Sequence, residues 1–300
     1  EQIAMSYQER GVELLRLPSG GKSRAITCAL PYIEGEVLVL TDVRQVLDPQ
    51  SLRKLVACFA DPQVGVVSGE LIIRDGDTLQ EVAIGAYWRF ETWVRNCMSK
   101  IDSMLGATGP YYAIRRRLVR PIPADTLLDD VYLPLGAFFE GYRLVMEPQA
   151  RAYDYPTSAK TEFRRKVRTM AGNYQLLRLY PQLLLGNRLW LDYVSYKLGR
   201  LLLPLFLLML LAGTFGLPDP WRVFAFAAQA LVYGLALLDL VVPEGFPGKK
   251  LTSPARVFVV MMFAALCGLS VWFVEPRTLW QPTQIPVRSE AGPGKRKTIQ

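Results

Sequence analysis

The sequence predicts an α/β domain that is followed by membrane-spanning helices. Short runs rich in Val and Leu alternate with segments of helical periodicity through the first two thirds of the chain, which is typical of an α/β fold. Residues 198–275 are strongly apolar, whereas residues 1–197 are mixed in character. Hydrophobic residues make up 51% of the chain, which is at the upper edge for a soluble domain.

The first predicted strand ends on a carboxylate. Residues 35–43 (GEVLVLTDV) are a short Val- and Leu-rich run, typical of a buried strand in a parallel sheet, and the run ends at Asp42. Open α/β sheets bind ligands at the carboxyl ends of their strands. Residues 1–17 read as the back of a helix that runs into a strand, so we expect the chain to begin within a domain.

The next segments predict helices and a glycine-rich turn. Asp48-Pro49 is a helix-start signal, and residues 64–75 have the pattern of a pair of strands. Residues 79–101 predict a helix whose aromatic face packs in the core. Residues 106–119 (GATGPYYAIRRRLV) predict a turn that enters a short helix, and such a turn can cradle an anion.

Three apolar stretches each approach the roughly 20 residues that cross a bilayer core. No polar face interrupts them, which favours membrane helices over the alternative, buried helices of a soluble bundle. The turn sequence LPDP at 217–220 joins the first two into a hairpin. The stretches are residues 198–217, 221–242 and 255–274.

The charge distribution predicts that the α/β domain is cytoplasmic. Residues 160–200 carry nine Lys or Arg against two acids, and the positive-inside rule places such a segment in the cytoplasm. Lys249 and Lys250, before the third stretch, agree with this. Three crossings would put the basic residues of 288–297 outside, so either the rule fails there or one stretch is re-entrant. We expect a multi-pass protein of the cell membrane.

An amphipathic segment precedes the first apolar stretch. Residues 183–197 alternate Leu, Trp and Tyr with Arg and Lys at helical spacing, which predicts a helix lying on the membrane; an ordinary surface helix is the alternative. The chain therefore divides into an α/β domain over 1–182, this helix over 183–197, about three transmembrane helices over 198–275, and a basic tail over 276–300.

Composition excludes several kinds of site. The chain has no His, and its Cys residues are far apart with no CxxC pair, which argues against a His-based triad and a structural zinc site. Scattered thiols fit a reducing compartment. The net charge of +8 suggests a partner with phosphates or an anionic membrane surface, but no nucleic-acid-binding signature is present. The Cys residues are Cys28, Cys58, Cys97 and Cys267.

Six segments carry a family resemblance through their order. They are LPSGGKSRAITCAL, TDVRQ, GATGPYYAIRR, LLDDVYLPL, GYRLVMEPQARAYDYP and EFRRKVRTMAGNYQLL. Over about residues 11–200 they resemble family 2 glycosyltransferases, in the membrane-embedded branch that includes cellulose and hyaluronan synthases. The resemblance implies a GT-A-like (Rossmann-like) mixed sheet with flanking helices. It also implies an N-terminally truncated chain, because that family begins with a further strand and a nucleotide-binding loop.

The resemblance implies a site for a nucleotide-sugar donor. TDVRQ occupies the place of the family's Asp-x-Asp, so Asp42 is the candidate ligand of Mg²⁺ or Mn²⁺, with a helix cap as the alternative. The Gly-Lys stretch puts Lys22 near the nucleotide. Arg165 and Arg168 share one helix face and are candidates to clamp the leaving diphosphate, with lipid headgroups as the alternative ligands.

The segment LLDDVYLPL occupies the place of the family's acidic pair. Asp130 is the candidate base for the acceptor hydroxyl, with Asp129 beside it. Two adjacent carboxylates repel, so we expect a raised pKa for one of them. The alternative is that both are solvent-facing caps of the following helix. On the acceptor side, the resemblance implies Gly106, Gly109 and Arg115.

Several positions depart from the family pattern. Arg44 replaces the second Asp of the Asp-x-Asp, which removes one metal-side carboxylate; Arg44 either contacts phosphate directly or pairs with a surface acid. Asp129 replaces the usual Glu. Arg165 and Thr169 replace the Gln and Trp of the last motif, so only Arg168 is retained. Because that Trp is thought to hold the acceptor sugar in processive synthases, its absence favours transfer of a single sugar.

These observations predict a membrane-bound inverting glycosyltransferase. The expected donor is a nucleotide sugar, and the expected acceptor is lipid-linked or a polysaccharide; membrane lipids are further partners. The alternative is a catalytically silent relative that scaffolds exopolysaccharide assembly. A transporter or channel is disfavoured, since the apolar stretches contain a single acid, Asp239.

Overall fold

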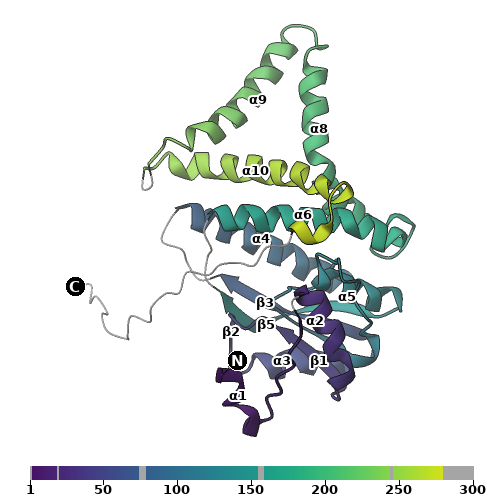
Figure 1. Ribbon diagram of the computed structural model, residues 1–300. Helices are drawn as coiled ribbons and strands as arrows, with labels where there is room; N and C mark the ends of the chain where they lie inside the picture. Colours follow the sequence, from purple (N-terminus) through teal and green to yellow (C-terminus); the bar gives the residue numbers. More distant parts are fainter. Residues whose placement is uncertain (1, 19, 74–78, 155–158, 244–245, 280–300) are drawn as a thin grey trace, which may run out of the picture.

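The protein has a layered α/β part and a group of long apolar helices (Figure 1). The structure, a computed structural model, describes residues 2–18, 20–73, 79–154, 159–243 and 246–279. The α/β part contains the sheet and its covering helices. The apolar helices stand on one side of it, beyond α4 and α6.

Five strands form a mixed sheet in the order β1-β4-β3-β5-β2. β3 and β5 pair in parallel, whereas the other neighbours pair antiparallel. The predicted mixed sheet with flanking helices is therefore confirmed. The strands are β1 (Val37–Thr41), β2 (Val46–Leu47), β3 (Val64–Ile73), β4 (Tyr111–Arg115) and β5 (Arg143–Asp154).

Some local predictions were wrong. β1 pairs antiparallel with β4 rather than within a parallel sheet. β3 is one continuous strand and not a pair, because it pairs with both β4 and β5. The glycine-rich turn enters strand β4 instead of a helix, and only a 3-10 turn, Arg116–Leu118, follows it. Residues 12–18 form no strand.

The core occupies both faces of the sheet, and β4 shows why. Tyr111 and Ala113 pack against Leu55 of α3 on one face, while Tyr112 and Ile114 pack in the cluster on the other face. This alternation is the two-residue period of a strand. The first four of the five β4 side chains are fully buried, and burial of large apolar groups contributes about 1.5–3 kcal/mol each.

Helices on the face of the sheet that Tyr112 and Ile114 occupy carry several residues of the site. The sheet is covered there by two long helices that run between it and the apolar helices (Figure 1). Shorter helices flank the sheet edge and supply the N-terminal turns described below. The helices of the α/β part are α1 (Gln2–Met5), α2 (Gly21–Ala29), α3 (Ser51–Ala57), α4 (Leu79–Ile101), α5 (Asp129–Phe139) and α6 (Ala159–Leu179).

Three helices among the described residues are long and apolar enough to cross a membrane: Trp190–Thr214, Trp221–Leu238 and Lys249–Trp272. The first is continuous from residue 190. The prediction of a separate amphipathic helix over 183–197 was therefore wrong. The reason is packing, because Leu189 and Tyr193 are buried in the core of the α/β part. The first helix consists of α7 (Trp190–Asp192), a π-helical turn (Tyr193–Leu198) and α8 (Gly199–Thr214).

The third apolar helix is arranged differently from the other two. α8 and α9 (Trp221–Leu238) form a hairpin that stands away from the sheet, whereas α10 (Lys249–Gly268) lies along α6 (Figure 1). The rings of Phe163 and Phe263 stack with centroids 6.0 Å apart. A Cβ atom on Gly268 would lie 2.9 Å from Met170 Cβ, so the two helices approach closely there.

A buried ionic cluster fixes the connection between α9 and α10. Asp239 is only 2% exposed and lies 3.4 Å from Lys249 Nζ and 3.2 Å from Arg256 Nη1. The Thr252 hydroxyl donates a hydrogen bond of 2.6 Å to Asp239 Oδ1. Because a buried carboxylate is costly unless paired and hydrogen-bonded, these partners account for the acid in an apolar segment.

Candidate active site

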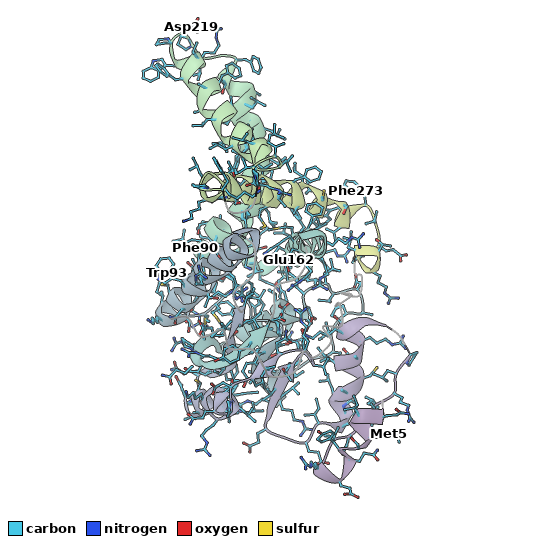
Figure 2. All side chains as sticks on the ribbon, turned by 90° about the vertical axis from the view of Figure 1, so that its left-hand side faces the viewer. Met5, Phe90, Trp93, Glu162, Asp219 and Phe273 are labelled. Carbon is cyan, nitrogen blue, oxygen red and sulfur yellow. The ribbon has the colours of Figure 1, made fainter. Side chains whose placement is uncertain are left out.

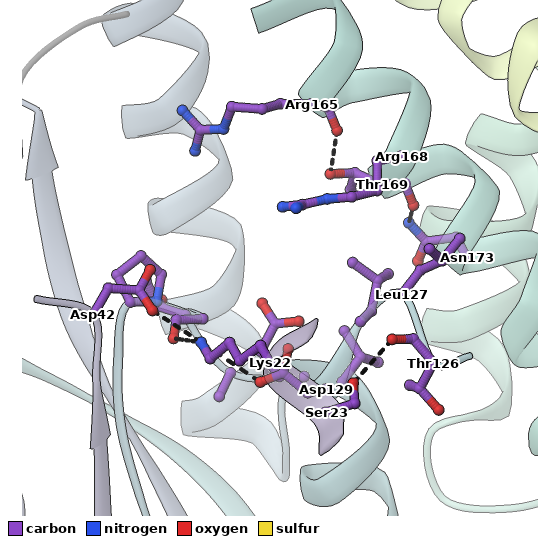
Figure 3. A pocket seen from close by; sticks show the side chains of 18 of the residues that line it. Lys22, Ser23, Asp42, Thr126, Leu127, Asp129, Arg165, Arg168, Thr169 and Asn173 are labelled. Carbon is purple, nitrogen blue, oxygen red and sulfur yellow. Dashed lines mark hydrogen bonds and ion pairs between the residues drawn. The ribbon is translucent and has the colours of Figure 1, made fainter. Parts of the chain in front are cut away.

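One cavity of about 1030 Å³ lies between the sheet and α6. Its lining comes from the N-terminus of α2, the end of β1, the turn before β4, the start of α5, and α6 (Figure 3). Nearly all site residues that the sequence predicted therefore meet in one place. They are Lys22, Asp42, Arg44, Gly106, Gly109, Asp129, Asp130, Arg165 and Arg168.

Lys22 lies between the carboxylates on the sheet side of the cavity. Its Nζ atom donates to Asp42 Oδ1 at 3.0 Å and to the Gly109 carbonyl at 3.1 Å, and it lies 3.5 Å from Asp129 Oδ2 (Figure 3). Burial lowers the pKa of Lys22, but the charges of Asp129 and Asp42 outweigh burial and raise it. Lys22 is therefore held as a cation.

Asp129 is a buried carboxylate at the first position of α5. Burial raises its pKa to about 6, and Asp130 adds to the rise, while Lys22 opposes it. Asp129 Oδ2 is buried without a hydrogen-bond partner among the described residues. The predicted raised pKa thus falls on Asp129, and a solvent-facing cap does not describe this residue.

Asp130 is partly exposed to the cavity, beside the glycine-rich turn. A Cβ atom on Gly109 would lie 2.5 Å from Asp130 Oδ2, so a larger residue there would displace this carboxylate from its present position. The backbone carbonyl of Asp130 also accepts a hydrogen bond of 2.8 Å from the Ala107 N–H. The turn and the start of α5 therefore fix the position of Asp130 together.

Two arginines of α6 face the carboxylates across the cavity. Figure 3 shows the guanidinium groups of Arg165 and Arg168 projecting into the space above Lys22 and Asp42. Burial lowers the pKa of Arg168, and the charge of Asp130 opposes that effect. Arg168 Nε is buried and lacks a hydrogen-bond partner within the described part of the chain. Unsatisfied buried groups of this kind indicate a site that a ligand completes.

Arg44 lines the cavity but is already paired. Its Nη2 atom lies 2.7 Å from Oδ2 of Asp154, a carboxylate that is buried at the end of β5. The structure thus shows an acid partner for Arg44, and its contact with phosphate stays a prediction.

Arg115 does not reach the cavity. The antiparallel register pairs Tyr111 with Thr41, next to Asp42, and Arg115 with Val37 at the opposite end of β1. The Arg115 guanidinium donates instead to the Val64 carbonyl at 2.7 Å. Its predicted acceptor-side role is therefore wrong, because the segment is a strand that carries residue 115 away from the turn.

A second group of cations lines the helix side of the cavity, around a buried acid, Glu91, and the sequence did not predict it. Glu91 of α4 lies 3.0 Å from Arg200 and 3.9 Å from Arg95. Burial opposes ionisation of Glu91, but Arg200 and Arg95 lower its pKa to about 2. A lone Glu within an aromatic helix face was the available signal. The other lining cations of this group are Lys166 and Lys197.

The cavity has an excess of positive charge. Nine Lys or Arg side chains line it against six Asp or Glu among the residues described. The carboxylates of Asp42, Asp129 and Asp130 cluster at the sheet, whereas five of the nine cations come from α6, the π-helical turn and the start of α8. This division suits a ligand that carries phosphates and a hydroxyl, because phosphates need cations and a hydroxyl needs a base.

As arranged, the described side chains do not provide a complete set of protein ligands for a divalent metal ion. No group of three or more Asp, Glu, His or Cys side chains that could hold a metal exists among the described residues. The two nearest carboxylates, Asp42 and Asp129, already share the ammonium of Lys22. Arg44 further places a cation where a second carboxylate is expected.

The fold and the arrangement of the site are typical of GT-A glycosyltransferases. Residues 37–272 match the family described as glycosyl transferase family group 2. The chain therefore belongs to that family, as the resemblance predicted.

The similar proteins are transferases of sugars. Two curated N-acetylglucosaminyltransferases, from Rhizobium meliloti (strain 1021) and Bradyrhizobium diazoefficiens, are 26% and 25% identical over 271 and 273 residues. Each alignment covers 83% of this chain but only 63% and 56% of the relatives, so the chain spans about three fifths of their length. The mannosyltransferase PcManGT from Pyrobaculum calidifontis, solved with GDP-Man and Mn²⁺, shares the fold with a TM-score of 0.63, at 20% identity, over 89% of this chain and 72% of its own.

Proposed function

We propose that the protein is a membrane-bound inverting glycosyltransferase. It transfers one sugar from a nucleotide-sugar donor to a hydroxyl group of a lipid-linked or polysaccharide acceptor. The observation that carries this proposal is the meeting of Asp130 and Arg168 across one cavity, where the charge of Asp130 acts on the Arg168 guanidinium. A base and a cation that faces it are the two groups that such a transfer requires.

The reaction assigns one role to each side of the cavity. The acceptor oxygen forms a bond to the anomeric carbon from the side opposite the diphosphate, which inverts that carbon. The bond from the anomeric carbon to the diphosphate oxygen breaks, and its electron pair leaves with the nucleoside diphosphate. Asp130 accepts the proton of the acceptor hydroxyl, while Arg165 and Arg168 stabilise the charge on the diphosphate.

Asp129 is a positioning residue in this scheme. Its carboxylate lies against Lys22, whereas Asp130 is the more accessible of the pair. Thr169 stands where processive relatives carry Trp, and its hydroxyl donates to the Arg165 carbonyl at 2.9 Å. This arrangement offers no aromatic platform for a sugar at position 169, which supports single transfer.

The membrane arrangement follows from the apolar helices. We place the α8–α9 hairpin across the bilayer and α10 at its surface, against α6 of the catalytic domain. Phe90 and Trp93, which are 53% and 61% exposed, lie on α4 at a level just below α10 (Figure 2). Exposed aromatic residues at this level fit the membrane interface.

Substitution of the proposed base tests this function. Sugar release from UDP-N-acetylglucosamine and from GDP-mannose is measured with the detergent-solubilised protein, with and without a lipid-linked acceptor. Asp130→Asn is expected to lower the rate by about 10²–10⁴-fold, because general base catalysis contributes that factor. Asp61→Asn, an exposed acid outside the cavity, is the matched control. Unchanged turnover by Asp130→Asn would remove the base assignment.

A further inference from the structure

We propose that the ammonium group of Lys22 takes the place of a divalent metal ion in this active site. It balances the charges of Asp42 and Asp129 and donates a hydrogen bond to a phosphate of the donor. Donor binding is therefore independent of metal. This inference rests on the proposed function, since it assigns the cation that assists the same leaving group.

The geometry of Lys22 carries the inference. Nζ lies 3.0 Å from Asp42 Oδ1 and 3.5 Å from Asp129 Oδ2, so the ammonium occupies the space between the two carboxylates. An ammonium group has three N–H donors. Asp42 and the Gly109 carbonyl accept two of them, at 3.0 and 3.1 Å, which leaves the third for a ligand.

The position of Lys22 in its helix indicates that the two carboxylates, and not the helix, hold the ammonium group in place. Lys22 is the second residue of α2, near the positive end of the helix dipole, where a cation is disfavoured. The contacts of Nζ with Asp42 Oδ1 at 3.0 Å and with Asp129 Oδ2 at 3.5 Å offset that effect. Lys22 is thus held at a site that its own helix disfavours.

Arg44 provides a second, independent observation. It stands where a second metal-binding carboxylate is expected, and it pairs with Asp154 at 2.7 Å. The position that is expected to supply a second metal ligand therefore supplies a cation, while Lys22 lies against Asp42. A divalent ion bound to Asp42 and Asp129 would lie within contact distance of the Lys22 ammonium, and like charges so close repel strongly.

The test measures metal binding and nucleotide binding separately. Bound Mn²⁺ is followed by electron paramagnetic resonance on the full chain in detergent micelles, alone and with UDP or GDP. UDP and GDP binding is measured by calorimetry with EDTA and with Mn²⁺. We expect the wild type to bind no Mn²⁺ and to bind nucleotide equally with EDTA. Lys22→Met should gain Mn²⁺ binding and lose at least about tenfold in nucleotide affinity in EDTA.

Control variants keep the result interpretable. Lys22→Arg keeps the positive charge and is expected to stay metal-independent, so it separates loss of charge from loss of folding. Lys22→Met with unchanged nucleotide affinity in EDTA would overturn the inference, as would wild-type Mn²⁺ binding with nucleotide affinity that EDTA abolishes. Transfer activity that strictly requires Mn²⁺ would contradict this inference and leave the glycosyltransferase proposal intact. Full activity of Asp130→Asn would instead contradict the assignment of the base and would not affect the inference about Lys22.

Discussion

The buried carboxylate of Asp129 lowers the stability of the folded protein, although the active site uses this residue. A carboxylate that is 8% exposed is ionised only at a cost, and Lys22 recovers part of that cost through its charge. The folded state therefore holds the Asp129 proton up to about pH 6, whereas an ordinary Asp releases it near 3.8. Sites that carry such groups are often less stable than their substituted variants.

The raised pKa of Asp129 makes stability depend on pH in a defined direction. Because the folded state binds the proton more tightly than the unfolded chain, stability falls as pH rises from about 4 through 6. A rise of about two units corresponds to about 3 kcal/mol at most. We expect Asp129→Asn to raise the melting temperature at pH 7.5 and to leave it nearly unchanged at pH 4. A lower melting temperature at pH 7.5 would contradict the burial argument.

Arg168 is expected to bind the donor diphosphate. Its buried Nε atom lacks a protein partner among the residues described, so we expect a phosphate oxygen of the donor to accept its hydrogen bond. Arg168→Ala should weaken UDP or GDP binding by about 10–100-fold, as a charge-assisted hydrogen bond contributes about 1.5–3 kcal/mol. Arg178→Ala is the matched control on the same helix, since Arg178 is 60% exposed and pairs with Asp125. Equal effects of the two substitutions, measured by calorimetry, would refute the role of Arg168.

At the scale of elements, the close contact between α6 and α10 holds the cationic side of the site. α6 carries Arg165 and Arg168, and α10 packs along it. The contact depends on Gly268, whose missing side chain lets the α10 backbone approach Met170 and Ala171. A side chain there forces the helices apart, because close-packed interiors do not absorb added volume freely.

Glycine substitutions on two apolar helices test this contact. Gly268→Ala should destabilise the protein by about 1–3 kcal/mol through overpacking, and should also lower transfer activity by displacing α6. Gly234→Ala on α9 has open space around its Cβ atom, and alanine favours helix, so its stability should be equal or higher. Thermal unfolding in detergent compares the two variants. A stable and fully active Gly268→Ala protein would argue against the contact.

At the scale of the whole molecule, the proposed place of α10 at the membrane surface would remove a conflict in the charge distribution. Three crossings would put the basic residues of 288–297 outside, against the positive-inside rule. In the arrangement that we propose, α8 and α9 cross the bilayer and α10 lies at its surface, so the chain would return to the side of the catalytic domain. The rule is then obeyed by residues 160–200, by Lys249 and Lys250, and by the C-terminal basic residues.

Labelling of single cysteines tests the number of crossings. In a background where Cys28, Cys58, Cys97 and Cys267 are replaced by Ser, a membrane-impermeant maleimide is applied to intact cells. Asp219→Cys, at the tip of the α8–α9 hairpin (Figure 2), should be labelled. Thr278→Cys should be labelled only after lysis, as should Lys54→Cys in the catalytic domain. Labelling of Thr278→Cys from outside would show a third crossing.

The sequence by itself determined the family, the mixed sheet and most of the residues that we propose for the site. The reason is that Asp42, Asp129 and Asp130 lie in short local motifs at element ends, where neighbouring residues dictate the turn and helix start, and that Arg168 lies within a single helix. The three apolar helices were likewise readable, because length and composition alone set the potential to cross a membrane.

Only the tertiary structure decided how those pieces meet. The register of β4 on β1 took Arg115 away from the cavity, and the packing of Leu189 and Tyr193 joined residues 190–198 to the first apolar helix. The ammonium of Lys22 lies between Asp42 and Asp129 although these residues are far apart in the chain. Such contacts depend on strand register and on the close approach of helices, and neither is encoded in the periodicity of one segment.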